Sequence, residues 1–369
     1  MSAKLCSSLA MTFVMVMAFA ITGCRTPQTG MHSAATTPCL AVIDRFTAAN
    51  VPAFGPAEIE SPIGNWTNPP TPEGLPGKDL AQHSMLYVGE NFTKMFLVND
   101  GKVIWTYQTG KGYEYDDVWM LSNGNILFTR MQYIAEITPD KKVVWRYDCD
   151  NSTNATHTEV HTCQPIGLDK VMFVLNGVPP RLMVVNTKTG KEEVNHEIPL
   201  MQPANPKTVH GQFRRARVTA HGTYLLSHLN ENRVVEYDKD FNKLWSYPIK
   251  SPWAAIRLKN GNTLITDERD NLTREVNPKG ETVWEFNTNE LPAEYRFTSA
   301  SQTCTRLANG NTVFCSRGVA NGKGPQLVEI TPAKKVVWVL QDWKVLGGAT
   351  AVQILDDPGI PENPGESEH

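Results

Sequence analysis

A block of about 40 residues returns several times along this chain of 369 residues, and this repeat constrains the fold more than any other feature. A clear copy spans 116–149, and the pattern returns at 254–287 and at 303–341. Each copy holds four short apolar runs separated by turn residues such as Asn123-Gly124 and Pro139-Asp140. A single four-stranded sheet cannot bury both of its faces. The repeat therefore predicts sheets arranged as blades around a common axis.

The ends of the repeat region predict how the ring closes. Apolar runs at 85–90, 94–99 and 103–108 make one strand too few for a blade, whereas 350–356 is an isolated strand at the other end. We expect this last strand to complete the first blade, because closure removes exposed sheet edges. The other blades are expected at 111–149, 155–198, 208–249, 251–287 and 297–341. The sequence thus predicts an all-β, six-bladed β-propeller of four-stranded antiparallel blades over 83–356.

Some residues recur at one register in several blades. A repeated residue is typical of the scaffold, because a binding site needs residues that differ from blade to blade. We interpret the repeated tryptophans as packing between blades and the repeated glutamates as structural hydrogen-bonding groups. These residues are Trp105, Trp145, Trp245, Trp284 and Trp338, with Glu136, Glu236, Glu275 and Glu329.

Residues 1–23 have the pattern of an export signal. Lys4 precedes a largely apolar run at 6–22, which is short for a membrane span, and small residues follow. The sequence Ile21-Thr22-Gly23-Cys24 resembles a bacterial lipobox, which implies that Cys24 is lipidated. We therefore expect an exported lipoprotein anchored to a membrane of the bacterial cell envelope, the outer membrane by preference. The alternative is a plain secretory signal in which Cys24 is unmodified.

The segments around the propeller lack strand periodicity. Residues 24–50 indicate a flexible tether with a short helix near 38–49, residues 51–82 a Pro-rich arm, and residues 357–369 a polar, Pro-rich tail. The formal net charge is −3 and there is no basic run, so nucleic acid is not an expected partner.

The cysteines permit two disulfides in an oxidising compartment. Cys304 and Cys315 flank the Asn309-Gly310 turn, and Cys149 ends one blade while Cys163 begins the next. The alternative is that these are buried thiols. No spacing is CxxC, so the cysteines predict no zinc or haem site.

Candidate site residues lie at the level where each first strand begins. Aligning the blades on the first-strand apolar residue places six unlike residues at one level, which are Asp116, His161, Phe213, Trp253, Gln302 and Thr350. We expect a ligand-binding face there, because the scaffold repeats while this ring does not. The candidate ligand contacts are Asp116, Arg130, His157, Arg214, His228, Trp253, Asp267, Gln302 and Arg317.

The segment 157–161, HTEVH, carries the strongest chemical signal. Alternation along an extended segment puts His157, Glu159 and His161 on one side. Such a set can ligate a metal, or it can act as a base with its orienting carboxylate. Spacing fixes no third ligand, so no metal site is predicted. His161, His210 and Glu159 are instead the candidate acid–base residues. The alternative is that the histidines are plain surface or buried structural residues.

Arginines make the expected face cationic although the chain is acidic. Arg130, Arg214 and Arg317 offer forked donors suited to a carboxylate or sulfate group. Trp253 would supply a flat apolar surface for a sugar ring, or it would pack as a plug at the mouth of the ring.

The repeated NGN turns, the Glu-apolar-Thr/Asn-Pro third strands and the Val-Trp fourth strands resemble the quinoprotein-like (PQQ-like) propeller repeat of bacteria. The resemblance covers 83–356 and implies the propeller fold. Enzymes and scaffolds both use this repeat. The chain departs from quinoprotein dehydrogenases, which have eight blades, because it has no adjacent Cys pair and no CxxCH segment. PQQ is therefore not an expected cofactor, and no other cofactor is implied.

Three functions remain open on these observations. The leading interpretation is an envelope-anchored propeller that binds an anionic or carbohydrate ligand on one face. The first alternative is a carbohydrate-active hydrolase or lyase, in which the histidines act as acid and base and the arginines neutralise a uronate or sulfate. The second alternative is a non-catalytic scaffold for another envelope protein. An enzyme should show a histidine hydrogen-bonded to a carboxylate at this face.

Overall fold

The computed structural model describes residues 37–48, 73–88, 94–108, 114–152, 157–297, 301–316, 324–343 and 345–369. The expected signal segment, Cys24 and Arg317 lie outside these residues, as do most of the tether and of the Pro-rich arm. Within the described part, none of the helices has the length and apolar character needed to cross a bilayer.

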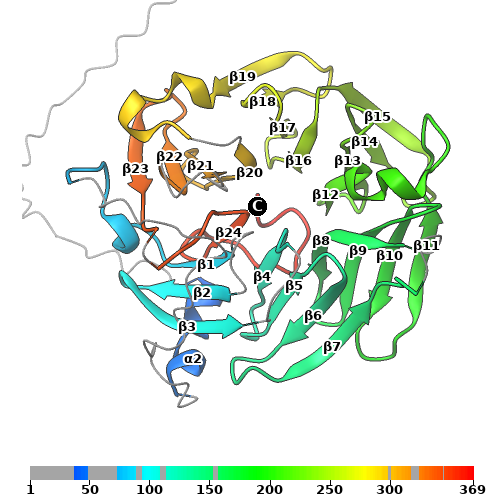
Figure 1. The fold of residues 1–369 in the computed structure, drawn as a ribbon, viewed down its shortest axis with the longest axis horizontal. Coiled ribbons are helices and arrows are strands. Elements are labelled where there is room, and N and C mark those ends of the chain that lie inside the picture. Colours follow the sequence, from blue (N-terminus) through cyan, green and yellow to red (C-terminus); the bar gives the residue numbers. More distant parts are fainter. Residues whose placement is uncertain are drawn as a thin grey trace, which may run out of the picture. The chain divides into compact units, whose positions relative to one another are not determined.

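Six antiparallel sheets of four strands surround one axis, which confirms the predicted six-bladed propeller (Figure 1). From the inside outward, the blades are β24-β1-β2-β3, β4-β5-β6-β7, β8-β9-β10-β11, β12-β13-β14-β15, β16-β17-β18-β19 and β20-β21-β22-β23. The strands of the first three blades are β24 (Ala351–Ile354), β1 (Met85–Val88), β2 (Lys94–Asn99), β3 (Lys102–Gln108), β4 (Val118–Met120), β5 (Ile126–Thr129), β6 (Tyr133–Ile137), β7 (Val143–Asp148), β8 (Glu159–Ile166), β9 (Lys170–Asn176), β10 (Arg181–Asn186) and β11 (Glu192–Glu197). The others are β12 (Phe213–Val218), β13 (Tyr224–His228), β14 (Arg233–Tyr237), β15 (Lys243–Pro248), β16 (Pro252–Arg257), β17 (Thr263–Asp267), β18 (Leu272–Val276), β19 (Thr282–Asn287), β20 (Ser301–Arg306), β21 (Thr312–Ser316), β22 (Leu327–Ile330) and β23 (Val336–Leu340).

The ring closes as predicted. Strand β24 pairs antiparallel with β1, with Met85 opposite Ile354 and Val88 opposite Ala351. The innermost strand of the first blade thus comes from the C-terminal end of the chain, and β24 lies beside β1 in Figure 1. Each of the six sheets therefore packs its faces against two neighbouring blades.

The repeated residues serve the scaffold. In the turn between β4 and β5, Gly124 has a φ of +84°, which favours glycine, and the Asn125 side chain then donates to Glu136 at 2.6 Å. The indole N–H of Trp105 reaches across to the carbonyl oxygen of Pro139 in the next blade at 2.9 Å, and Trp284 bonds Pro332 in the same way at 3.0 Å. These contacts confirm that the glutamates and tryptophans are structural.

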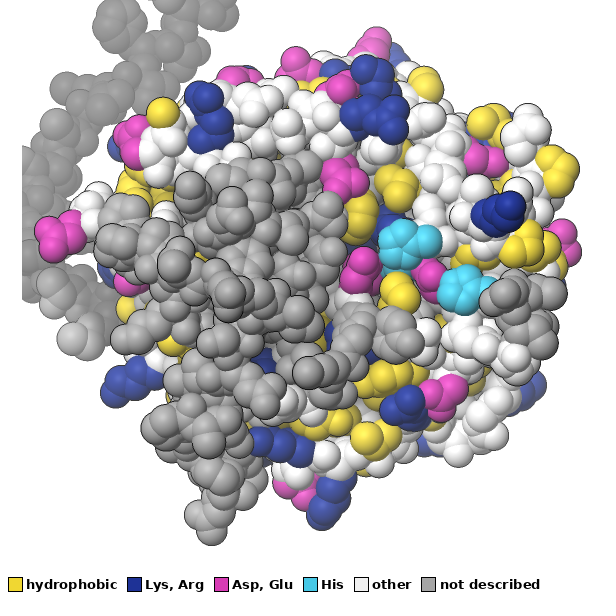
Figure 2. Space-filling view, viewed as in Figure 1, with side chains coloured by type: hydrophobic (Ala, Val, Ile, Leu, Met, Phe, Trp, Pro, Cys, Tyr) yellow, Lys and Arg dark blue, Asp and Glu magenta, His cyan; other side chains and the backbone are white. Residues whose placement is uncertain are grey.

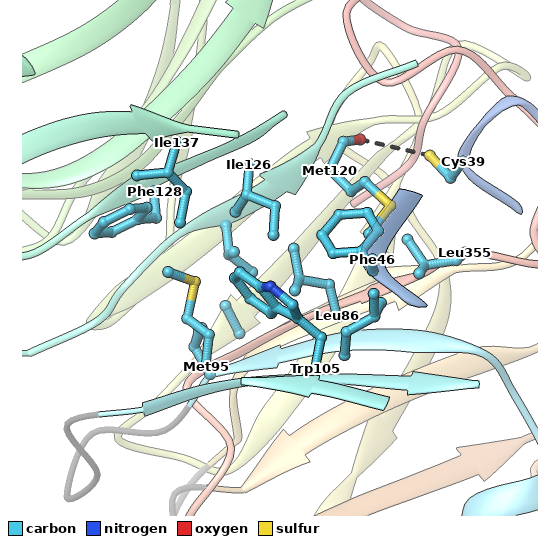
Figure 3. Close-up of a cluster of buried hydrophobic side chains, with 14 of the residues drawn as sticks. Cys39, Phe46, Leu86, Met95, Trp105, Met120, Ile126, Phe128, Ile137 and Leu355 are labelled. Carbon is cyan, nitrogen blue, oxygen red and sulfur yellow. Dashed lines mark hydrogen bonds between the residues drawn. The ribbon is translucent and has the colours of Figure 1, made fainter. Parts of the chain in front are cut away.

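Short helices flank the propeller. The expected helix near 38–49 consists of two pieces, α1 (Pro38–Ala41) and α2 (Asp44–Ala48). Phe46 packs edge-on against Trp105 with the ring centroids 5.4 Å apart, and Cys39 donates to the Met120 carbonyl oxygen (Figure 3). The 3₁₀ helices are η2 (Asp79–Ala81), η3 (Pro206–Gly211), η4 (Thr288–Glu290) and η5 (Ala293–Tyr295).

The tail at 357–369 folds back onto the ends of the inner strands. The N–H groups of Gly167 and Arg306 donate to Glu362 O and Glu368 O at 2.8 and 3.1 Å. His369 is 1% exposed and lies edge-on against Trp119 with the centroids 4.6 Å apart, and Figure 1 marks this end of the chain in the middle of the ring. The tail therefore fills the ring axis where the inner strands end.

The two predicted disulfides are absent, and all four cysteines are free thiols. The register places Cys304 opposite Phe314, while Cys315 faces a bulge. Cys304 and Cys315 consequently pack into different apolar clusters, on opposite faces of their blade. Cys149 lies just beyond the outer strand β7, whereas Cys163 lies on the inner strand β8. These positions correct the sequence-based pairing.

Candidate functional site

The predicted site level coincides with β-bulges at the start of four inner strands. In β8, β12 and β20, two consecutive residues stand opposite one residue of the neighbouring strand. In β16, Trp253 is the extra residue between Pro252 and Ala254. A bulge re-aims side chains without ending the strand. The residues that the bulges present are His161-Thr162, Arg214-Arg215, Trp253 and Gln302-Thr303.

The register corrects one member of the predicted ring of unlike residues. The alignment placed Phe213 at the site level, but Phe213 packs in the core of its blade at 1% exposure. Arg214 occupies that level instead, in the same bulge position as His161 and Gln302. The alignment was one residue out in this blade, because Thr219 and not Val218 holds the position before the turn that Leu258 and Leu307 hold in theirs.

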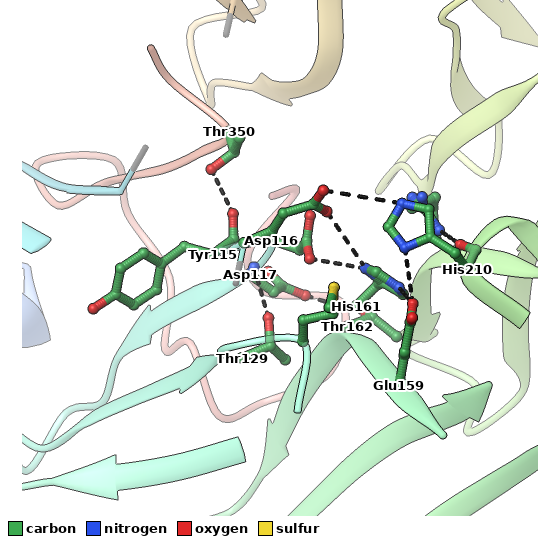
Figure 4. A network of polar contacts seen from close by, with 12 residues as sticks. Tyr115, Asp116, Asp117, Thr129, Glu159, His161, Thr162, His210 and Thr350 are labelled. Carbon is green, nitrogen blue, oxygen red and sulfur yellow. Dashed lines mark hydrogen bonds and ion pairs between the residues drawn. The ribbon is translucent and has the colours of Figure 1, made fainter. Parts of the chain in front are cut away.

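His161 links two carboxylates (Figure 4). Its Nδ1 lies 2.9 Å from Oδ2 of Asp116, and its Nε2 lies 2.9 Å from Oε2 of Glu159. All three residues are at most 4% exposed. Asp116 comes from the segment before β4, and the two others come from β8, so the contact joins adjacent blades.

Two further histidines converge on Glu159. Nδ1 of His210, at the end of η3, lies 2.8 Å from Oε2 of Glu159. Nε2 of His157 lies 2.7 Å from the other oxygen, Oε1. The His210 side chain is 51% exposed, so it is the member of the group that solvent reaches most freely. Figure 2 shows histidine and acidic side chains together near the middle of this face.

The charges of the group perturb each other. Burial and the nearby Arg214 act to lower the pKa of His161, but Asp116 and Glu159 outweigh them and raise this pKa above its usual value. Burial acts to raise the pKa of Glu159, yet hydrogen bonds from His161 and His210 hold it well below its usual range. Glu159 is therefore ionised, as a carboxylate, near neutral pH.

Arg214 lies beside this group. Its guanidinium carbon is 4.5 Å from the centroid of the Trp253 ring, and Nη1 donates to the carbonyl oxygens of Phe213 and His210. Its Nε is buried and has no hydrogen-bond partner in the described part of the chain. Two blades further on, the buried Oε1 of Gln302 likewise has no partner in the described residues, although its Nε2 donates to Glu268 at 3.2 Å.

Beneath this level, Asp117 forms a separate network on the ring axis. The Arg217 guanidinium donates to it twice, with Nη1–Oδ2 at 2.7 Å and Nη2–Oδ1 at 3.0 Å. Nη2 of Arg215 lies 3.7 Å from Oδ1. This network joins the inner strands to the tail, because Nε of Arg217 donates to the carbonyl oxygen of His369 at 2.8 Å.

The structure brings most of the predicted site residues together. Seven of them form one connected group, which comprises Asp116, His157, Glu159, His161, His210, Arg214 and Trp253. Gln302 lies at the same level in its blade. Arg130 stacks on Tyr115 at 4.4 Å, and Arg317 lies outside the described residues.

Two predicted site residues have local structural partners. His228 is buried and its Nδ1 bonds Glu231 at 2.9 Å, while its ring packs on Phe213. Asp267 accepts a hydrogen bond from the N–H of Asp270 at 3.0 Å, which stabilises the turn after β17. No described contact joins either residue to the His161 group.

Glu114 is a site residue that sequence reasoning missed. Its carboxylate oxygens lie 4.0 Å from Nδ1 of His161 and 3.9 Å from Nε2 of His210. The available signal was the alternation of Glu114 with Asp116, which matches the alternation of Glu159 with His161 and places each pair on one side of its segment.

Comparisons with known proteins identify the fold. The chain matches no known family profile and no curated protein. A solved structure of a protein of unknown function from Bacteroides caccae is 24% identical, with a TM-score of 0.63 over 73% of this chain and 97% of that one. A streptogramin B lyase is 13% identical, with a TM-score of 0.50 over 74% and 86%. BamB from Moraxella catarrhalis is 14% identical, with a TM-score of 0.40 over 67% and 66%.

These similarities are confined to architecture. Each relative is less than 25% identical to this chain, so the likeness shows the β-propeller alone. The chemistry of this chain must be argued from its own side chains, above all from the group around Glu159.

Proposed function

We propose that this protein binds an anionic, hydroxyl-bearing ligand, of which an acidic glycan is the natural example, where its inner strands begin. The observation that carries the proposal is a pair of unsatisfied groups at the same level of the ring, in the two blades that flank the blade of Trp253. Arg214 Nε is a buried cationic donor and Gln302 Oε1 is a buried acceptor. Leaving such groups unpaired costs about 1–3 kcal/mol each, so a ligand that satisfies both gains affinity.

The two unsatisfied groups need different hydrogen-bonding partners on the ligand. The Arg214 donor suits a carboxylate or sulfate oxygen. Gln302 Oε1 accepts a hydrogen bond, which a sugar hydroxyl can donate and a carboxylate or sulfate oxygen cannot. Trp253 belongs to the blade between them, and the Arg214 guanidinium carbon lies over its ring. A uronate or a sulfated sugar carries both groups on one ring.

The histidine–carboxylate group favours a second candidate function, a hydrolase or lyase acting on the same ligand. The specific observation is that His210 is half exposed and hydrogen-bonded to Glu159 beside Arg214. A reactive group and a guanidinium that neutralises an adjacent acid are both needed for cleavage of a uronate. The experiment described next shows whether the protein only binds the ligand or also cleaves it.

An array of acidic and neutral glycans, scanned for binding and for cleavage products, tests the proposal. We expect acidic glycans to bind, and Arg214→Gln to weaken their binding roughly tenfold or more through loss of a charged hydrogen bond. Arg181→Gln is the matched control, because Arg181 lies on β10 and bonds Asn195 of the neighbouring outer strand. Equal binding by both variants, or binding of neutral glycans alone, would contradict the proposal. Cleavage products would establish the enzymatic candidate.

A further inference from the structure

We infer that Glu159, His161 and His210 form a binding site for one divalent transition-metal ion, and that zinc fits it best. The inference goes beyond the proposed function, because a metal ion can bind here with no glycan present. It rests on how the donor atoms converge, on the groups that orient them and on the local charge.

The donor atoms already point at one place. Oε2 of Glu159 lies 2.9 Å from Nε2 of His161 and 2.8 Å from Nδ1 of His210, and the three atoms lie within 4.8 Å of one another. Ligands bound to zinc at about 2.0–2.2 Å in a tetrahedral arrangement are roughly 3.3–3.6 Å apart. Small side-chain shifts would therefore suffice to admit an ion among these atoms.

The surrounding residues hold the donors as metal sites require. Nδ1 of His161 is hydrogen-bonded to Asp116, which leaves Nε2 for the ion. Oε1 of Glu159 is hydrogen-bonded to His157, which leaves Oε2. Nε2 of His210 lies 3.9 Å from Glu114, which is beyond hydrogen-bond distance, while its Nδ1 faces the shared point. Two of the three donors are thus oriented by a hydrogen bond on their far side, which is the arrangement typical of metal ligands.

The side chains around the donors favour a cation. Glu114, Asp116 and Glu159 supply three carboxylates, and Arg214 supplies one guanidinium, so acidic groups outnumber the fixed positive charge. His161, Asp116 and Glu159 are buried, where an uncompensated charge is costly. A divalent ion held by these donors would offset the charge of the carboxylates.

The donor set selects the metal. Two imidazoles and one carboxylate form a set that binds zinc and leaves a fourth position open. Magnesium and calcium prefer sets made only of oxygen. Sequence spacing could not reveal the site, because its third donor comes from η3, 49 residues beyond His161, and meets the others only through the packing of two blades.

The test uses zinc alone. The full chain is stripped with a chelator and titrated with ZnCl₂ in competition with a chromophoric chelator, and Co²⁺ absorption reports the coordination. We expect one zinc ion per chain, bound more weakly by at least tenfold in Glu159→Gln and in His210→Ala. His210 is half exposed at the end of a short helix, so its removal should spare the fold. His221→Ala is the control, because His221 is an exposed histidine outside the group.

A second variant separates a metal site from a plain hydrogen-bonded cluster. Asp116→Asn keeps the size of the group that orients His161 but removes its charge, and loss of such a partner typically weakens metal binding 10–100-fold. Absence of zinc binding by the unmodified chain at micromolar concentrations overturns the inference. So does binding that Glu159→Gln and His210→Ala leave unchanged. Glycan binding plays no part in these readouts, so the two proposals can fail independently.

Discussion

Nδ1 of His83, just before β1, lies 3.0 Å from Oδ2 of Asp356, just after β24. Nε2 of the same ring lies 3.1 Å from Oε2 of Glu329 in the neighbouring blade. One imidazole thus joins the strand pair that closes the ring to the blade beside it. Burial acts to lower the pKa of His83, but the hydrogen bonds to Asp356 and Glu329 outweigh it and raise the pKa from 6.5 to about 9.

Stability should therefore depend on pH through His83. Its pKa is higher in the folded than in the unfolded chain, so its contribution is fully present below about pH 6.5 and is lost as pH rises through about 9. At about 1.4 kcal/mol per pKa unit, the contribution is on the order of 3 kcal/mol. We expect the free energy of unfolding in urea to fall across this window. His83→Gln should flatten the fall and His221→Gln should not; an unchanged slope in His83→Gln would refute the assignment.

Asp117 should be among the most costly charges to remove. Its carboxylate is fully buried, and Arg217 and Arg215 both face it. Asp117→Asn leaves these buried guanidiniums without their anion, so we expect a loss of roughly 3–5 kcal/mol in the free energy of unfolding. The control is Asp140→Asn, an exposed turn position that should behave like the parent protein. Denaturant unfolding of both variants measures the difference, and a neutral Asp117→Asn would argue against this ion pair.

Substitution of His161 and of His210 should affect stability differently, although the sequence predicted both as acid–base candidates. His161 is 2% exposed within β8, between Asp116 and Glu159, whereas the His210 side chain is half exposed. In the metal-free protein, His161→Ala leaves two buried carboxylates facing each other and should cost about 3–5 kcal/mol. His210→Ala should cost about 1 kcal/mol or less. Calorimetric melts compare the two, and an equal loss would contradict this difference in burial.

The fold was predictable because its signals are local and repeated. Every blade carries its own turns, such as Asn123-Gly124. Only the first blade lacked a strand in the sequence, so the strand at 350–356 was expected to pair there. The tail was less predictable because its contacts are specific backbone hydrogen bonds, such as that from Arg306 N–H to Glu368 O, which leave no periodic pattern. A polar, Pro-rich composition does not distinguish a free tail from one that folds back.

The site was predictable only to the level of the ring. The unlike residues at one register of the inner strands indicated the position of the site. Alternation along the extended segment predicted that His157, Glu159 and His161 lie on one side of it. The contacts between blades could not be predicted, because they depend on how far a side chain reaches from one blade toward the next. Glu114 approaches His161 and His210 in this way. Phe213 was placed at the site level in error, because the alignment used Val218 where Thr219 holds the position before the turn.

Lipidation of Cys24 remains a proposal that a single substitution tests. The residue follows Gly23 and an apolar run at 6–22 that is short for a membrane span. We expect the full-length chain expressed in bacteria to partition with membranes, and Cys24→Ser to release it into the soluble fraction. Cys39→Ser is the control, because Cys39 is buried in the folded domain and should leave the partitioning unchanged. Continued detergent dependence of Cys24→Ser would rule out a lipid on this residue.

The thiols of the propeller should be free and slow to react. Burial raises the pKa of Cys304 to about 12 and that of Cys315 to about 11, so neither forms a thiolate readily near neutral pH. We expect iodoacetamide to spare both in the folded protein and to label both after unfolding without reductant. The melting temperature should not change when reductant is added, because a disulfide would constrain the unfolded chain and its loss would lower stability by about 2–4 kcal/mol. A melting temperature that falls with reductant would restore the pairing that sequence spacing predicted, and would require Cys304 and Cys315 to leave the separate clusters in which they pack.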